Sequence, residues 1–131
     1  MVIIDTTVWI DYLRATDTPE TRWLDQHLTQ ERLGLTDLIL CEVLQGIRNA
    51  NSFAAVRDEL LKFHVFETGG VDLAIAAARN CRKLREHGYT VRRTIDTLIA
   101  TFCLEASQSL LHRDRDFDIF EKVLGLSVVH P

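Results

Sequence analysis

The sequence predicts a three-layer α/β/α protein with a central, mostly parallel sheet of four to five strands. Short β-branched or apolar runs alternate along the chain with longer segments in which apolar residues recur at helical spacing. Because parallel strands need crossover connections, this alternation favours helices on both faces of one sheet. A length of 131 residues is enough for one such domain, spanning residues 1–131, but not for two independent cores.

The first half of the chain is expected to contain one strand and four helices. Pro19 suits the first turn of the second helix. The expected elements are a strand at residues 2–4 and helices at residues 8–13, 19–28, 37–48 and 52–62.

The second half continues the alternation. Gly69 and Gly70 close a strand, Gly88 ends a long helix, and Thr94 can cap the helix that follows. The expected elements are strands at residues 64–67, 109–112 and 126–129, and helices at residues 71–87, 95–106 and 117–124.

Composition limits the functions that the chain can have. The net charge of −4 means that the molecule as a whole does not attract a polyanion, so any nucleic-acid contact must be local. The longest purely apolar stretch, residues 73–78, is too short to cross a bilayer. Asp5 stands where a secretory signal would be basic or apolar, so we expect a cytoplasmic protein. The odd number of cysteines (Cys41, Cys81 and Cys103) favours reduced packing residues.

Acidic residues follow two of the predicted strands. Asp5 comes directly after residues 2–4, and Asp114 and Asp116 come just after residues 109–112. The carboxyl ends of parallel strands meet at one edge of a sheet, where such folds bind ligands. Each acid also has a simpler explanation, because Asp5 suits a helix N-cap and the other two suit the start of a helix.

Two further acids lie within predicted helices. Asp96 shares a helical face with Ile99, Ala100 and Cys103, so its carboxylate is either bonded to its own helix start or is a paired acid or metal ligand. Glu42 lies on a mixed face that is partly covered or simply solvated.

As a set, these carboxylates favour a metal site. Two like charges about 4 Å apart repel by about 4 kcal/mol at an effective dielectric of about 20, so a cluster of four needs a cation to stay ionised. All-oxygen ligands favour Mg²⁺ or Mn²⁺ over zinc. Such an ion can promote phosphodiester hydrolysis.

The chain resembles the PIN-domain ribonucleases, and in particular the VapC-like toxins of bacterial toxin–antitoxin pairs. The resemblance rests on residues 2–9, 40–46, 94–100 and 111–117 in that order, and it covers essentially the whole chain. It implies a PIN-like α/β/α fold.

The resemblance also implies site residues. Asp5, Glu42, Asp96 and Asp114 would form an acidic quartet that holds Mg²⁺ or Mn²⁺, with Asp116 as an added acid. Thr7 would be the hydroxyl residue that supports the first aspartate. The pattern commonly has threonine or serine where this chain has His112, so a hydroxyl contact is missing there.

The implied activity is metal-dependent endonucleolytic cleavage of RNA that leaves a 5′-phosphate and a 3′-hydroxyl. A homodimer, inhibited by a small antitoxin laid across its active-site groove, is implied as well. The alternative is a catalytically weak PIN-like domain that serves mainly as an antitoxin-binding or scaffold partner.

Several arginines flank the acids. Arg92 and Arg93 precede Asp96, and Arg113 and Arg115 bracket Asp114, so these four either bind substrate phosphates or form salt bridges with the acids. The helical side that carries Arg79, Arg82, Lys83 and Glu86 is expected to be a solvated face rather than an RNA track.

Other site types fit less well. A calcium-binding loop starting at Asp114 would need a glycine at Ile119 and a glutamate at Gly125. A haloacid-dehalogenase-like phosphatase would need an aspartate at Thr7, and a phosphoacceptor receiver would need an acidic pair where Ile4 precedes Asp5.

Overall fold

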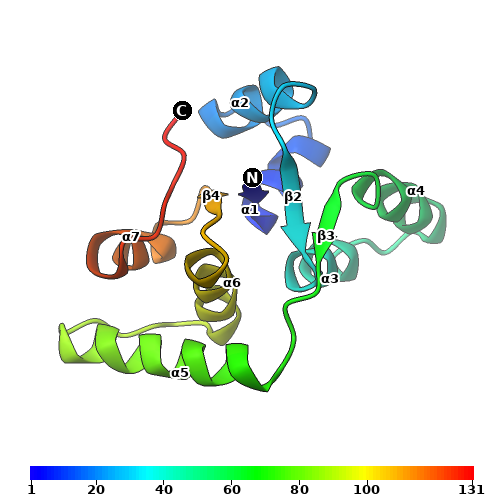
Figure 1. Ribbon diagram of the computed structural model, residues 1–131. Helices are drawn as coiled ribbons and strands as arrows, with labels where there is room; N and C mark the ends of the chain where they lie inside the picture. The colour runs from blue at the N-terminus through cyan, green and yellow to red at the C-terminus, as the bar shows by residue number, and fades with distance from the viewer.

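The computed structural model describes residues 1–131 and contains one four-stranded sheet with the strand order β3-β2-β1-β4 (Figure 1). All three strand pairs are parallel, as predicted. The strands are β1 (Val2–Ile4), β2 (Leu33–Thr36), β3 (His64–Phe66) and β4 (Ser109–Leu111). From β1 the chain proceeds outward through β2 and β3, and then returns to place β4 on the other side of β1. The sheet therefore has its topological switch point between β1 and β4.

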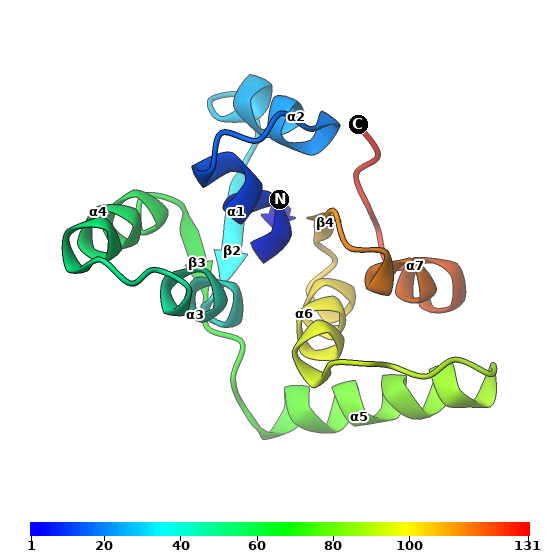
Figure 2. The ribbon, with the colours of Figure 1, turned by 180° about the vertical axis from the view of Figure 1, so that it is seen from behind.

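Helices surround this sheet, and Figure 2 shows the same arrangement from behind. They are α1 (Thr6–Leu13), α2 (Pro19–His27), α3 (Asp37–Gln45), α4 (Ala50–Leu60), α5 (Val71–Glu86), α6 (Thr94–Glu105) and α7 (Asp118–Leu124), with a 3-10 turn, η1 (Arg115–Phe117), before the last. Helix α5 packs against α6 and α7 along one side of the molecule (Figure 1). The chain end returns to the neighbourhood of α2 in both views (Figures 1 and 2).

The core consists of apolar side chains from the strands and from the helices that cover them. Ile3 and Ile4 of β1, Leu35 of β2 and Leu110 and Leu111 of β4 are fully buried. Because both faces of the parallel sheet are covered, its inner strands read as apolar runs without alternation. No helix is long and apolar enough to span a membrane.

Local signals explain the starts of four helices and the end of α5. The side chains of Asp5, Thr18, Thr36 and Asn49 each accept a hydrogen bond from a backbone N–H of the helix that follows. Gly88 follows α5 with φ +85°, and its neighbour Tyr89 donates to the carbonyl of Leu84 at 2.9 Å. This is a Schellman termination, for which glycine is the favoured residue.

Strand β2 was not predicted. Its sequence, Leu-Gly-Leu-Thr, has no alternation and joins directly to α3, so it resembles a helix entrance. Gly34 is required there, because a Cβ would lie 2.9 Å from both the carbonyl oxygen of His64 and the sulfur of Met1. The strand could not be predicted from its own residues, because the need for a glycine comes from contacts with β3 and Met1.

Three smaller expectations were also wrong. The closing strand at residues 126–129 is a single bridge between Leu110 and Val128. Thr94 is the first residue of α6 rather than its cap, since Arg93 takes the cap position without a side-chain hydrogen bond. Cys41 was expected to be a packing residue but is exposed, whereas Cys103 is buried; all three cysteines are free, as expected.

Candidate active site

The predicted acids converge at the switch point, beginning with Asp5. Its backbone N–H donates to the carbonyl of Leu111 at 2.9 Å, so the β1–β4 pairing continues up to this residue. Asp5 caps α1, and its Oδ2 accepts hydrogen bonds from the Thr7 hydroxyl at 2.7 Å and the Thr7 N–H at 3.2 Å. The Thr7 hydroxyl in turn accepts from the N–H of Arg113 at 3.1 Å. Thr7 therefore ties the segment after β4 to the first acid.

Asp5 is only 3% exposed, and this burial has an electrostatic consequence. Desolvation raises the pKa of Asp5 from 3.8 to about 6, against the opposing effect of the two Thr7 hydrogen bonds. The charges of Glu42 and Asp96 contribute to the same rise in the pKa. A carboxyl with such a pKa can exchange a proton near neutral pH.

Glu42 enters the site from α3 and is half-buried. Its Oε1 accepts a hydrogen bond of 2.7 Å from the hydroxyl of Thr6. It flanks the face of its helix that carries the buried residues Ile39 and Val43, so it is not simply solvated. Thr6 was not predicted as a site residue, although it belongs to a pair of hydroxyl residues directly after Asp5.

Asp96 lies in the first turn of α6 and is 3% exposed. Arg93 donates to both of its carboxylate oxygens, from Nε and Nη2, each at 3.2 Å. The same Nη2 lies 3.6 Å from Oδ2 of Asp114, so one guanidinium bridges two acids. Burial raises the pKa of Asp96 despite the opposing effect of Arg93, and the charges of Asp114 and Glu42 raise it as well.

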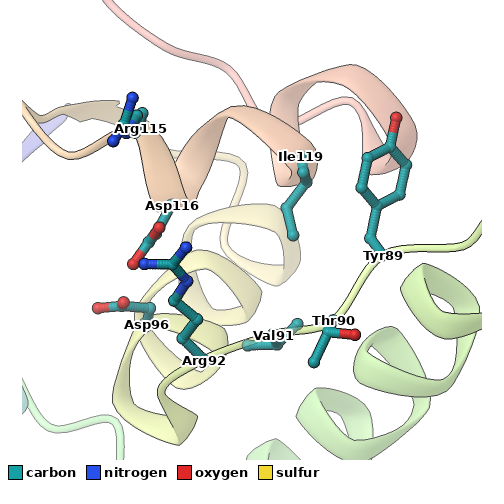
Figure 3. Close-up of a pocket in the computed structure, with 8 residues that line it drawn as sticks. All are labelled: Tyr89, Thr90, Val91, Arg92, Asp96, Arg115, Asp116 and Ile119. Atoms are coloured by element: carbon teal, nitrogen blue, oxygen red, sulfur yellow. The ribbon is translucent and has the colours of Figure 1, made fainter.

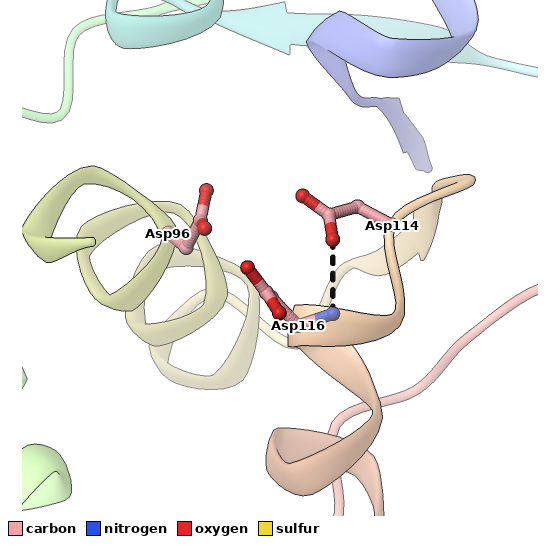
Figure 4. Close-up of side chains that lie close together, drawn as sticks. All are labelled: Asp96, Asp114 and Asp116. Carbon is pink, nitrogen blue, oxygen red and sulfur yellow. Dashed lines mark hydrogen bonds between the residues drawn. The ribbon is translucent and has the colours of Figure 1, made fainter. Parts of the chain in front are cut away.

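Asp114 and Asp116 complete the cluster from the turn after β4. Asp114 caps η1, and its Oδ1 accepts from the N–H of Asp116 at 2.9 Å (Figure 4). Carboxylate oxygens of Asp96, Asp114 and Asp116 all lie within 4.8 Å of one another, and Figure 4 shows the three side chains turned toward a common space. Asp5 and Glu42 are outside this closest group, although the charge of Glu42 raises the pKa of Asp96 and the charge of Asp96 raises the pKa of Asp5.

These residues fit a divalent cation. Three acids from two elements face one point, and burial together with neighbouring acids raises the pKa values of Asp5 and Asp96. A hard cation with oxygen ligands relieves that repulsion. The acids that are closest together are Asp96, Asp114 and Asp116, and the chemistry of the donor set suits Mg²⁺ or Mn²⁺ better than zinc.

The four predicted arginines fall into two pairs. Arg93 pairs with the acids as described, and Arg113 pairs through Nη1 with Asp11 at 3.1 Å. Arg92 and Arg115 form no ion pair and line a cavity of about 190 Å³ together with Asp96 and Asp116 (Figure 3). Arg92 and Arg115 are thus available to an anion at the acidic cluster.

His112, which replaces the expected hydroxyl residue, is part of the framework. Its Nδ1 accepts from the N–H of Asp114 at 3.1 Å, and its ring packs 5.0 Å from the ring of Phe117. Burial lowers the pKa of His112, so the ring is neutral at neutral pH. Its Nε2 is buried without a partner.

Comparison with known proteins agrees with this geometry. The PIN domain family matches residues 2–123. The VapC ribonuclease Mb1587 of Mycobacterium bovis and ribonuclease VapC11 of Mycobacterium tuberculosis are each 32% identical to the chain, in alignments of 131 positions that cover 96% of this chain and 96% of each relative.

Solved structures of similar shape come from toxin–antitoxin proteins. VapBC2 from Rickettsia felis, bound to a promoter DNA fragment, has a TM-score of 0.78 at 13% identity, covering 98% of both chains. FitAcB from Neisseria gonorrhoeae has a TM-score of 0.77 at 21% identity, covering 100% of this chain and 98% of the other. VapC20 from Mycobacterium tuberculosis, a Sarcin-Ricin loop cleaving toxin, has a TM-score of 0.69 at 19% identity over the full length of both chains. At these identities the solved structures establish the fold.

Proposed function

Because this chain belongs to the PIN domain family, with VapC ribonucleases as its curated relatives, we propose that it is a metal-dependent endoribonuclease and the toxin of a toxin–antitoxin pair. The observation that carries the proposal is the convergence of acids from β1, α3, α6 and the turn after β4 at the switch point of the sheet. The buried core joins residues from β1 to Leu126, which supports one domain over residues 1–131.

Asp96, Asp114 and Asp116 would hold a Mg²⁺ or Mn²⁺ ion, with Asp5 and Glu42 completing the acidic set. A bound ion of this kind offsets the charge of the phosphoryl oxygens and makes a water molecule more acidic. Thr7 orients Asp5 through two hydrogen bonds, and Thr6 orients Glu42 through one.

The reaction is hydrolysis of a phosphodiester bond. Water oxygen bonds to phosphorus, the bond from phosphorus to the 3′-oxygen breaks, and the products are a 3′-hydroxyl and a 5′-phosphate. Asp5 lies beside the acidic cluster and is suited to accept the proton that the water loses, and a proton from solvent completes the 3′-hydroxyl. The free guanidinium groups of Arg92 and Arg115 would bind phosphoryl oxygens at the same cavity, and Arg93 and Arg113 would support them once released from their acids.

The proposal extends to partners. Related structures are described as toxin–antitoxin complexes, which supports a cognate antitoxin for this chain and, with the family resemblance, a homodimer. Leu13, Leu61, Val71 and Ile75 are apolar side chains that this chain leaves exposed. Such surface is consistent with protein contacts.

The test is cleavage of RNA by the purified protein with Mg²⁺, with Mn²⁺ and with EDTA. We expect cutting only with a divalent ion, and its loss in Asp5→Asn and in Asp96→Asn while far-UV circular dichroism is unchanged. Asp58→Asn is the matched control, because Asp58 is an exposed acid on α4 that pairs only with Arg57. Retained cleavage in both site variants would refute the assignment.

One observation favours the second candidate, a catalytically weak PIN-like domain that acts mainly through an antitoxin. Arg93 already pairs with Asp96 and lies 3.6 Å from Asp114, so its single positive charge offsets part of the charge that a metal ion would bind. Metal binding without RNA cleavage, together with unaltered growth inhibition by Asp5→Asn, would favour this alternative.

A further inference from the structure

An uncompensated basic segment leads away from the acidic cluster. Residues 79–93, which span the end of α5 and its connection to α6, contain six basic side chains and one acid, Glu86, in a chain whose net charge is −4. Of the six, only Arg93 forms an ion pair. The other five therefore keep their charge available to an external anion.

Part of this segment borders a groove between α5 and α6. The groove has a volume of about 490 Å³ and combines an apolar surface, including Ala77 and Leu98, with the guanidinium-bearing residues Arg82, Arg85 and Arg92. Figure 1 shows α5 running beside α6, whose first turn carries Asp96. The groove therefore begins next to the proposed catalytic acids.

The groove adjoins the cavity that contains Asp96 and Asp116, because Val91 and Arg92 line both. Arg82 and Arg85 also line a further surface hollow, together with Glu86. Unpaired arginines therefore continue from the acids along the groove.

This path suits single-stranded RNA better than an acidic peptide. A strand whose phosphate is cut at the acids must continue in some direction, and its next phosphates need cations there. Arginine forms bidentate bonds to phosphate, and an apolar floor accepts bases by stacking. An acidic peptide would satisfy the arginines but has no need to reach the catalytic acids.

We propose that the groove between α5 and α6 is a subsite for the RNA strand that flanks the scissile phosphate, with Arg82 and Arg85 binding its backbone phosphates. This inference rests on the proposed ribonuclease function and assigns the direction in which the substrate leaves the acids. It replaces the expectation that this side of α5 is merely solvated.

The first test measures binding without cleavage. Fluorescein-labelled oligouridylate is titrated with the protein in EDTA, and the double variant Arg82→Ala/Arg85→Ala is compared with Arg14→Ala/Arg32→Ala. Both pairs are exposed and unpaired, and Arg32 lies at the amino end of the sheet, where its carbonyl pairs with Val2. We expect the groove variant to raise the Kd about tenfold and to reduce the salt slope by about 1.4, as loss of two phosphate contacts requires for a single strand.

Equal Kd values for the two double variants would overturn the proposal. Unchanged oligouridylate binding together with lost binding of polyglutamate would also overturn it and would make the groove a protein-docking surface. Thermal melts of both variants show whether either change has disturbed the fold.

The second test separates this proposal from the ribonuclease function itself. With Mn²⁺, the groove variant should cut a dinucleotide as fast as the parent, because a dinucleotide is too short to reach the groove, and should have a raised KM for a long RNA. Equal loss on both substrates would contradict the subsite. If the parent cuts no RNA at all but the groove variant still loses oligouridylate binding, the ribonuclease proposal fails and the binding site stands.

Discussion

Asp5 combines two roles that oppose each other energetically. It caps α1 and accepts two hydrogen bonds from Thr7, yet burial and nearby acids make its ionised form costly. In the unfolded chain the same carboxyl titrates near its ordinary value. Ionisation of this residue therefore weakens the folded state when no cation is bound.

This gives a pH dependence with a definite sign. The pKa of Asp5 rises from 3.8 to about 6 on folding, so between these values the folded protein holds a proton that the unfolded chain has released. The contribution of Asp5 to the free energy of unfolding is complete below pH 3.8 and is lost as the pH rises through about 6. A shift of about 2 units corresponds to about 3 kcal/mol.

We therefore expect Asp5→Asn to be more stable than the parent by about 3 kcal/mol at pH 7 in EDTA, and equally stable below pH 4. Urea unfolding across this pH range measures the difference. A constant gap between the two proteins at every pH would contradict the assigned pKa.

Arg93 is a second residue with competing roles. Its guanidinium already binds Asp96 and lies 3.6 Å from Asp114, two of the acids proposed to hold the metal. A cation at these carboxylates must compete with this internal charge. The interaction is therefore expected to reduce the metal affinity of the free protein.

Arg93→Ala should bind Mn²⁺ about tenfold more tightly than the parent, because removal of one competing charge is worth about 1.4 kcal/mol at such a site. Isothermal titration calorimetry measures the affinity. Arg113→Ala is the control, since Arg113 pairs with Asp11 outside the cluster. Tighter binding in both variants would point to net charge rather than to Arg93.

At the scale of elements, β2 decides the geometry of the sheet. It lies between β1 and β3 and hydrogen-bonds to both. Gly34 allows this close approach because its Cα faces the backbone of His64. The order of the strands, and with it the switch point at β1, depends on this short segment.

Gly34→Ala should lower the free energy of unfolding by about 1–3 kcal/mol, because the new methyl group would lie 2.9 Å from a backbone oxygen that cannot move without disturbing the β2–β3 pairing. Gly46→Ala is the matched control: its Cβ would meet only its own helix, at 3.6 Å and 4.0 Å, and its φ is −79°. We expect that change to be neutral or slightly stabilising. Equal losses in urea unfolding would mean that the contact at Gly34 is not decisive.

At the scale of the whole molecule, charge is divided between two regions. The acids gather at the carboxyl edge of the sheet, and unpaired arginines gather beside them on α5 and its connection to α6. Local attraction to a polyanion is thus possible in a protein whose net charge is −4. Binding of the proposed metal ion to the acids would stabilise the entire fold, because the acids come together only when the strands are assembled.

Mn²⁺ at 100 times its Kd should stabilise the parent by about 2.7 kcal/mol, which raises the Tm. Asp96→Asn should lose this increase, whereas Asp58→Asn should retain it, because only Asp96 belongs to the acidic cluster. Thermal unfolding with and without Mn²⁺ gives the comparison. A metal-dependent rise in Asp96→Asn equal to that of the parent would place the ion elsewhere.

The sequence by itself determined the α/β class, most helices, and the positions of Asp5 and Asp114 after strands, because periodicity, capping residues and strand ends are local properties of the chain. It also identified Asp96 as an acid on an apolar helical face, which is buried as expected.

Only the tertiary structure decided that residues 33–36 form an inner strand, that Thr6 holds Glu42, and that Arg93 bridges Asp96 and Asp114. These contacts join residues far apart in the chain or depend on which side chains share a buried space. These contacts are determined by packing and electrostatics between segments, so they cannot be predicted from local sequence patterns.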